Sequence, residues 1–249
     1  MTKYILFPLL SLRLLYADFT GGEISLGIFS HTPSGQASYT LPLTSGTTAA
    51  DLEETLGWSN AQDLVFKGYI EHPAPFLPNV KLGYTQLSHD GTQNVTLFSW
   101  GDIIDFTGTL ESALSINMTD ITLYYELLDN WVEIDAGLTA RYLSGDIDNT
   151  TRLQKAKVNF SLWVPMFYAK TRFNLPTTDD ISLQAELNAI SYSDITLYDY
   201  EISARYTFMM GLGLEAGYKV IHIDSDDLNS GLKSDMDFKG FYGAIVWDF

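Results

Sequence analysis

The sequence predicts an all-β protein, a single transmembrane antiparallel up-and-down β-barrel of about ten strands. Three observations predict it. Apolar residues recur at every second position, short and long connections alternate along the chain, and the last residue is aromatic, Phe249. Every second side chain of a strand lies on one face, whereas a helix would scatter the same residues around its circumference. No apolar run reaches the ~18 residues that a membrane-spanning helix needs.

The alternation is clearest in residues 131–142 and repeats in residues 198–208 and 212–220. In the first of these segments the apolar set is Val132, Ile134, Ala136, Leu138, Ala140 and Tyr142. The residues between them are mostly polar or charged, including Glu133, Asp135 and Arg141. Each segment therefore predicts a strand with one apolar face and one polar face.

Weaker versions of the pattern complete a series of ten strands. We predict strands near residues 23–30, 64–72, 79–87, 117–127, 131–142, 164–175, 181–191, 198–208, 212–223 and 236–249. The short links are residues 73–79, 128–130, 176–180 and 209–211, and the longer links are residues 31–63, 88–116, 143–163, 192–197 and 224–235. Short turns at one end and long loops at the other are typical of outer-membrane barrels.

Residues 1–17 have the features of a secretory signal peptide. Lys3 precedes a mostly apolar stretch, and Ala17 supplies a small residue for cleavage. The alternatives are an ordinary N-terminal helix or a misassigned start. Cleavage would remove two basic residues and no acidic ones, changing the net charge from −17 to −19. We therefore expect one domain, residues 18–249, in the outer membrane of a Gram-negative bacterium.

The position of the apolar face decides between a soluble and a membrane barrel. A soluble sandwich or lipocalin-like barrel also alternates, with its apolar face inward. Here Phe241, Trp247 and Phe249 resemble the C-terminal signal that the barrel-assembly machinery recognises, although Ala244 stands where that pattern usually has Gly. Aromatic residues gather near the strand ends, as they do at membrane interfaces. A charge facing lipid at mid-depth costs ~2–4 kcal/mol, so the charged face is expected to line the lumen.

The predicted lumen carries a dense set of basic and acidic side chains. They are Lys67, Glu71, Lys81, Asp120, Glu126, Glu133, Asp135, Arg141, Lys170, Arg172, Glu186, Glu201, Arg205, Glu215 and Lys219. A ten-stranded barrel is only slightly wider than the eight-stranded barrels that side chains fill. We expect a salt-bridged, largely filled lumen in a protein with a structural or surface-interaction role. The alternative is a narrow conduit for small polar solutes.

Composition narrows the classes of function and partner. The 14 Lys and Arg against 31 Asp and Glu exclude the basic surface that nucleic-acid binding needs. The absence of cysteine excludes disulfides, thiolate nucleophiles and cysteine metal sites. The 15 Tyr, 14 Phe and 5 Trp are assigned to a lipid-facing belt. We expect no cofactor and no metal, and as partners the outer-membrane lipid, lipopolysaccharide and the assembly machinery.

An enzymatic role has weak support in the sequence. His222-Ile223-Asp224, with Asp226 and Asp227 nearby, permits a remote alternative as a rim hydrolase, because a carboxylate can orient a histidine base. However, His222 continues the outward face of its strand. The other three histidines, at positions 31, 72 and 89, show no grouping that predicts catalysis. The acidic loops raise a further hypothesis, a divalent bridge to lipopolysaccharide phosphates.

Three stretches resemble a known family: residues 71–80 (EHPAPFLPNV), 120–131 (DITLYYELLDNW) and 211–218 (GLGLEAGY). The family consists of small outer-membrane proteins of marine and related gammaproteobacteria. The bacteria in which they occur also carry GlyGly-CTERM sorting signals. The similarity extends from about residue 64 to the end of the chain. The resemblance implies a β-barrel in the outer membrane and assigns no activity, ligand or catalytic residue.

Overall fold

The computed structural model describes residues 21–249, apart from residues 41–48, 75, 176–179 and 229–230. The predicted signal peptide therefore lies outside the described residues. None of the helices in the described part is long and apolar enough to cross a membrane.

The described chain forms eleven strands and one 3-10 turn. They are β1 (Gly21–Tyr39), β2 (Ala50–Asp51), β3 (Ala61–Glu71), β4 (Asn79–Trp100), β5 (Ile103–Asp129), β6 (Val132–Thr150), β7 (Lys155–Asn174), β8 (Ile181–Tyr192), β9 (Ile195–Thr207), η1 (Met209–Gly211), β10 (Leu212–Ser225) and β11 (Leu232–Asp248).

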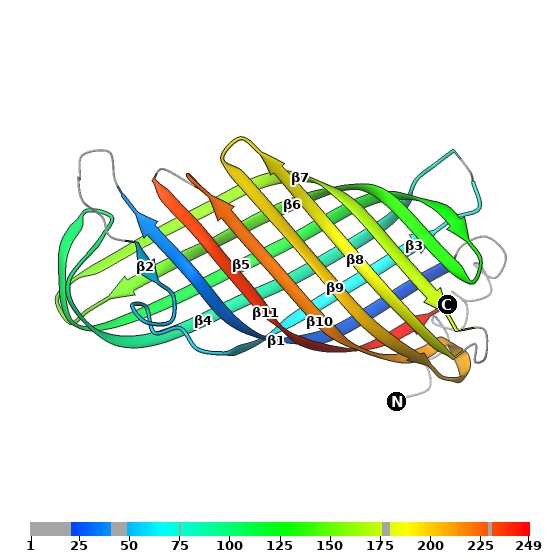
Figure 1. The fold of residues 1–249 in the computed structure, drawn as a ribbon, viewed down its shortest axis with the longest axis horizontal. Coiled ribbons are helices and arrows are strands. Elements are labelled where there is room, and N and C mark those ends of the chain that lie inside the picture. Colours follow the sequence, from blue (N-terminus) through cyan, green and yellow to red (C-terminus); the bar gives the residue numbers. More distant parts are fainter. Residues whose placement is uncertain (1–20, 41–48, 75, 176–179, 229–230) are drawn as a thin grey trace, which may run out of the picture.

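Ten of these strands close into one antiparallel barrel, as the alternation predicts (Figure 1). Each strand pairs with the next one, β11 pairs with β1, and the two-residue β2 joins the side of β1. Starting at Gly22 on β1 and moving from each residue to its partner on the next strand, one circuit of the barrel ends at Ser34 on β1. The register is therefore staggered by 12 residues around the barrel. For ten strands, that stagger corresponds to a strand tilt of about 40°.

The two ends of the described chain meet at one end of the barrel, which we call the base. The amide of Gly22 donates to the carbonyl of Phe249 at 3.0 Å, and the amide of Phe249 donates back at 2.8 Å. The short connections also lie at the base. At η1, Met210 and Gly211 both have positive φ, which turns the chain tightly between β9 and β10.

The prediction of long loops at the other end is wrong for much of their length. Strands β4 and β5 extend to Trp100 and Ile103, and β6 and β7 extend to Thr150 and Lys155. The alternation continues in these extensions with its polarity reversed, so that apolar side chains are buried inside and small polar residues face outward. These extensions therefore lack the apolar outer face that characterises the predicted strands.

The barrel therefore has two sections of opposite polarity, the base section and the distal section. The base section exposes apolar side chains on its outer wall, including Ile24, Leu26, Ile28, Leu64, Ile70, Leu82, Ile121, Leu123, Leu138, Phe167, Leu183, Ile202, Leu214 and Ile245. On the outer wall of the distal section the side chains are polar: Thr32, Asp90, Lys155, Lys157, Asn159 and Ser161 are exposed, and Ser88, Ser144 and Asp146 are half-buried.

The interior changes in the opposite sense. In the distal section it is a packed apolar core that includes Phe29, Leu87, Leu110, Leu114, Ile116, Leu143, Ile147, Phe160, Val164, Leu197, Ile223, Met236 and Phe238. Residues 50–60, which comprise β2 and its connection to β3, insert Leu52, Leu56 and Trp58 into this core. The assignment of the aromatic residues to a lipid-facing belt is thus wrong for several of them, since Phe29, Phe238, Trp58 and Trp100 are buried inside.

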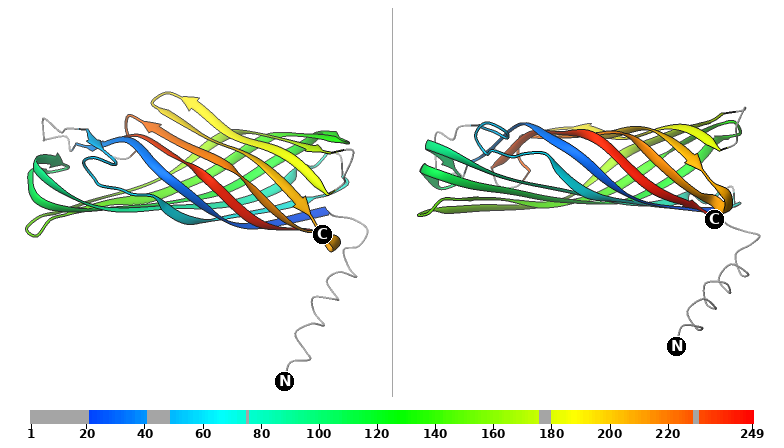
Figure 2. Two further views of the ribbon diagram at one scale, coloured as in Figure 1. Left: turned by 60° about the horizontal axis from the view of Figure 1, so that its bottom comes forward. Right: turned by 90° about the horizontal axis from the view of Figure 1, so that it is seen from below.

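In the distal section, β7 extends past the end of the β8–β9 hairpin. The β8–β9 hairpin ends at Tyr192 and Ile195, whereas β7 continues to Lys155 (Figure 2). The pairing of β7 with β8 stops at Phe167, two residues from Pro165, and proline has no amide hydrogen to donate to a neighbouring strand. Beyond that point β7 pairs only with β6 among the strands of the described chain.

Candidate functional site

Two arginines, Arg205 and Arg172, lie in the charged lumen at its base end. Arg205 donates to both oxygens of Glu23, at 2.8 and 2.6 Å, and to Glu215 at 3.0 and 2.8 Å. Arg172 contacts Glu23 at 2.7 Å and Glu133 at 3.4 Å. Because each guanidinium joins two carboxylates from different strands, these contacts cross-link β1, β6, β7, β9 and β10 through the interior.

Lysines extend the network deeper into the barrel. Lys67 and Lys81 form ion pairs with Glu201 and Glu186, respectively. Lys219 also contacts Glu201, at 3.2 Å. All five side chains are less than a tenth exposed. Their charges are therefore paired inside the barrel, as buried charges must be.

Arg141 forms the end of the network nearest the distal section. It binds Asp120 through two hydrogen bonds, of 2.7 and 2.6 Å, and contacts Asp199 at 2.7 Å. Asp199 also lies 3.5 Å from Lys219. This bidentate pairing uses the planar fork of arginine and fixes its orientation.

Tyrosines join the two layers of ion pairs. The hydroxyl of Tyr242 donates to Glu201 at 3.2 Å and to Glu215, so a polar chain runs from Arg205 to Lys67. Tyr69 donates to Glu186 at 2.7 Å, and the ammonium of Lys170 lies 4.0 Å above the Tyr69 ring. The ion pairs and the tyrosine hydroxyls thus form one connected network from the base to the distal core.

All fifteen charged residues predicted for the lumen lie at inward positions. Glu71, Glu126, Glu133 and Asp135 gather near the base, where Tyr124 donates to Glu71 at 3.1 Å and Asn79 to Glu126 at 2.7 Å. The prediction did not include three partners that complete the network: Glu23, Asp199 and Tyr242. The strand alternation places all three on the inward face, so the missing information was the pairing and not the face.

Little free volume remains among these side chains. A polar cavity of about 10 Å³ lies between Lys67, Lys81, Asp120, Arg141 and Glu186, together with their neighbours. This is about the space of one water molecule.

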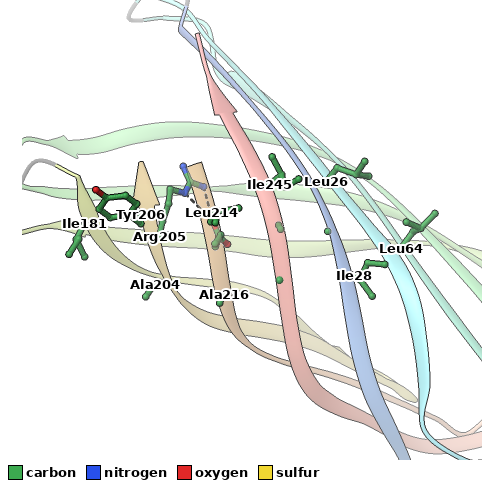
Figure 3. A pocket seen from close by; sticks show the side chains of 14 residues that line it. Leu26, Ile28, Leu64, Ile181, Ala204, Arg205, Tyr206, Leu214, Ala216 and Ile245 are labelled. Carbon is green, nitrogen blue, oxygen red and sulfur yellow. Dashed lines mark hydrogen bonds and ion pairs between the residues drawn. The ribbon is translucent and has the colours of Figure 1, made fainter. Parts of the chain in front are cut away.

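A larger hollow, of about 730 Å³, lies on the outer wall of the base section (Figure 3). Its floor contains Ala204, Ala216 and Gly243, which are paired across β9, β10 and β11. Exposed apolar side chains such as Leu26 and Ile245 surround it. Since the hollow faces outward, it adds no chamber to the lumen.

His222, the residue of the hydrolase alternative, lies on the outer wall. Its Nδ1 is 3.0 Å from Asp237 on β11, and its ring stacks on Tyr198 at 4.7 Å. Asp237 also accepts a hydrogen bond from Lys239 at 3.0 Å. Within the described ranges, no group of three or more His, Asp and Glu side chains converges as a metal site.

The structure brings together two other histidines that the sequence analysis left ungrouped. The Nε2 of His31 on β1 lies 3.1 Å from the carboxylate of Asp63 on β3, and the ring of His89 on β4 lies 4.7 Å away, edge to face. The Nδ1 of His89 donates to the carbonyl of Ser59 at 2.8 Å. Burial, reinforced by the neighbouring His89, lowers the pKa of His31 to about 4 although Asp63 opposes the shift. Burial also lowers the pKa of His89.

Aromatic pairs mark both margins of the apolar outer wall. Trp131 packs on Phe173, and Trp247 packs on Phe249, at the base. The opposite margin has the pairs Tyr142–Trp163 and Tyr218–Phe241. Rings of this kind lie at the two interfaces of a membrane barrel.

Solved structures share this architecture. The outer membrane protease OmpT of Escherichia coli aligns over 94% of this chain and 98% of its own, with a TM-score of 0.54 and 12% identity. The fold is that of an outer-membrane β-barrel. The translocator domain of the autotransporter NalP of Neisseria meningitidis aligns over 97% of this chain and 93% of its own, with a TM-score of 0.47 and 11% identity. No family model and no curated protein matches the sequence.

In an outer-membrane β-barrel, the base section is the membrane-spanning section. Its apolar outer wall meets lipid, and its charged lumen is enclosed by the wall. The distal section, which includes His31, Asp63 and His89, lies beyond the apolar wall on the side opposite Gly22 and Phe249.

Proposed function

We propose that this protein is a non-enzymatic barrel of a Gram-negative outer membrane, with a structural or surface-interaction role and a lumen closed by its own side chains. The observation that carries the proposal is the connected network from Arg205 to Arg141. Its members are buried and paired across the interior. Moving ions or solutes through it would require separating buried charge pairs, which costs several kcal/mol for each pair.

The distal section supports the same function. Its interior is packed with apolar side chains, and its outer wall is polar with many acidic residues. Such a section extends a rigid, hydrated surface beyond the membrane, as a surface-interaction role requires. Lipopolysaccharide remains the partner that we propose for the outer wall near the membrane margin.

Recordings from the refolded protein in planar lipid bilayers test the closed lumen. We expect no stable unitary conductance from the wild type. A stable conductance in the wild type would contradict the proposal and favour the alternative, a narrow pore for small polar solutes. The small polar cavity beside Lys67 and Arg141 is the observation that favours this second function.

Two finer assignments also remain proposals. The resemblance of residues 71–80, 120–131 and 211–218 supports membership of the gammaproteobacterial family described above. The rim hydrolase has less support, because His222 and Asp237 face outward. Cleavage of peptide or lipid by the wild type that is lost in His222→Ala would favour the hydrolase.

A further inference from the structure

The inserted segment, residues 50–60, is held in the distal core by backbone and side-chain hydrogen bonds. Its backbone pairs with β1 at Ala50 and Asp51, the amide of Leu52 donates to the carbonyl of Gly35 at 3.0 Å, and Trp58 forms a bridge with Gly91 on β4. The indole of Trp58 donates to Ser112 on β5 at 2.9 Å, and Thr32 on β1 donates to Asn60 at 2.8 Å. The third side-chain contact is the hydrogen bond from His89 to the carbonyl of Ser59. These contacts tie the segment to three different strands.

Aromatic rings surround the histidine pair. His89 stacks with Phe238 at 5.3 Å and with Trp58 at 6.2 Å. His31 lies 4.6 Å from Phe29. His31 is 1% exposed and His89 is 3% exposed, so both rings are shielded from water.

The hydrogen bonds fix which nitrogen of each ring carries the hydrogen. A carbonyl only accepts, so the Nδ1 of His89 is the donor to Ser59. Likewise, the Nε2 of His31 donates to the Asp63 carboxylate, which also accepts from the amide of Ser88 at 2.6 Å. The opposite nitrogens, Nδ1 of His31 and Nε2 of His89, are buried and have no hydrogen-bond partner in the described structure.

The charged groups near the rings are few. Asp63 faces them from β3, and Asp90 is the neighbour of His89 on β4. The side chains that pack against the rings from β1 and β11 are the uncharged Phe29 and Phe238. The inserted segment contributes Trp58 and the Ser59 carbonyl. A single carboxylate therefore faces two imidazoles.

We propose that His31 and His89 form an acid-sensitive latch, which holds the inserted segment in the distal core while both rings are neutral and releases it when they take up protons. A proton would add a second N–H to each ring at a nitrogen that has no acceptor. A buried donor without a partner is destabilising, and two imidazolium ions 4.7 Å apart repel each other. Withdrawal of Trp58 and Ser59 exposes the rings to water and removes both penalties.

The direction of the pH effect follows from linkage. A histidine whose folded-state pKa is lowered contributes stability that is present above its ordinary pKa of 6.5 and is lost as the pH falls toward about 4. With these two values, His31 alone shifts the equilibrium toward the released segment by about 30-fold between pH 7.5 and pH 5. Protonation of His89 acts in the same direction.

Hydrogen exchange of the full chain, refolded in detergent micelles, measures this release. After correction for the intrinsic pH dependence of exchange, we expect the opening constant of peptides within residues 50–60 to rise about 30-fold from pH 7.5 to pH 5. We expect no such rise in residues 181–207, which form the β8–β9 hairpin. Equal changes in both regions, or no change in either, would overturn the latch.

The four histidines of the chain provide matched controls. The double variant His31→Gln/His89→Gln keeps hydrogen-bonding amides but does not titrate, and it should lose the pH response. The variant His72→Gln/His222→Gln should retain it. A response that persists in the first variant contradicts the proposal.

A measurement on protein with both latch histidines intact covers the case in which the first variant does not fold. In the variant His72→Gln/His222→Gln, the imidazole NMR signals come from His31 and His89 alone. The latch requires that they titrate clearly below pH 6.5 and that residues 50–60 open over the same pH range. Titration of both rings near pH 6.5 would overturn it.

Discussion

The base and distal sections are built from the same strands, yet the polarities of their outward and inward faces are opposite. On β6, the outward Leu138 lies in the base section and the outward Ser144 in the distal section, whereas the inward Arg141 is followed by the inward Leu143. The two-residue period never changes. The polarity assigned to each face changes, because lipid surrounds one section and water the other.

The difference shows that the two sections are stabilised by different forces. Where water surrounds the wall, burial of apolar side chains inside drives folding. Where lipid surrounds the wall, apolar side chains on the outside gain little from contact with the protein. There the interior is held by charged and hydrogen-bonded groups that would be costly to leave unpaired. Four predictions test this division, from the largest expected effect to the smallest.

The largest effect is expected from Arg205→Ala in the base section. The change leaves Glu23 and Glu215 without the guanidinium that joins them, and breaking a buried ion pair typically costs ~3–5 kcal/mol. Urea unfolding of the protein in lipid vesicles measures this loss. A loss below ~1 kcal/mol would mean that water already screens the network.

Packing should dominate in the distal section. Leu143 is fully buried, and Leu143→Ala is expected to lower the free energy of unfolding by ~2–5 kcal/mol through lost burial and a residual cavity. Leu123, 48% exposed on the outer wall of the base section, is the matched control. In vesicles, Leu123→Ala should have the much smaller effect, and the reverse order would break the comparison.

Lysine substitutions on one face of β6 locate the boundary between the sections. Leu138→Lys places a charge against lipid and is expected to destabilise the protein in bilayers by ~2–4 kcal/mol. Ser144→Lys, six residues further along the same face, should change stability by less than ~0.5 kcal/mol because it faces water. Similar losses in both variants would place the lipid boundary beyond Ser144.

The smallest effect is expected at a surface ion pair of the distal section. Asp148 is partly buried, which raises its pKa, but hydrogen bonds from Lys155 and Thr150 outweigh this and the pKa is lowered overall. Its small contribution is present above its ordinary pKa of 3.8 and is lost as the pH falls further. Lys155→Ala should raise the pKa of Asp148, measured by carboxyl NMR, and cost at most ~0.5 kcal/mol.

Much of the base section could be predicted from local pattern. Alternation identified ten strands and the inward face of residues such as Lys67, Arg141 and Glu215 without knowledge of their neighbours. The distal extensions were missed because apolar positions such as Leu114 and Ile116 alternate there with small polar residues, which resemble a loop. The pattern was present, but its polarity was the reverse of the one sought.

The sequence by itself determined the strand number, the two-faced strands and the charged lumen, because a two-residue period is a property of neighbouring residues. Only the tertiary structure decided which charges pair and which histidines meet. Arg205 and Glu23 are 182 positions apart, and His31 and Asp63 are 32 apart. They come together because ten strands close with a fixed stagger, and that stagger depends on the whole barrel rather than on any one strand.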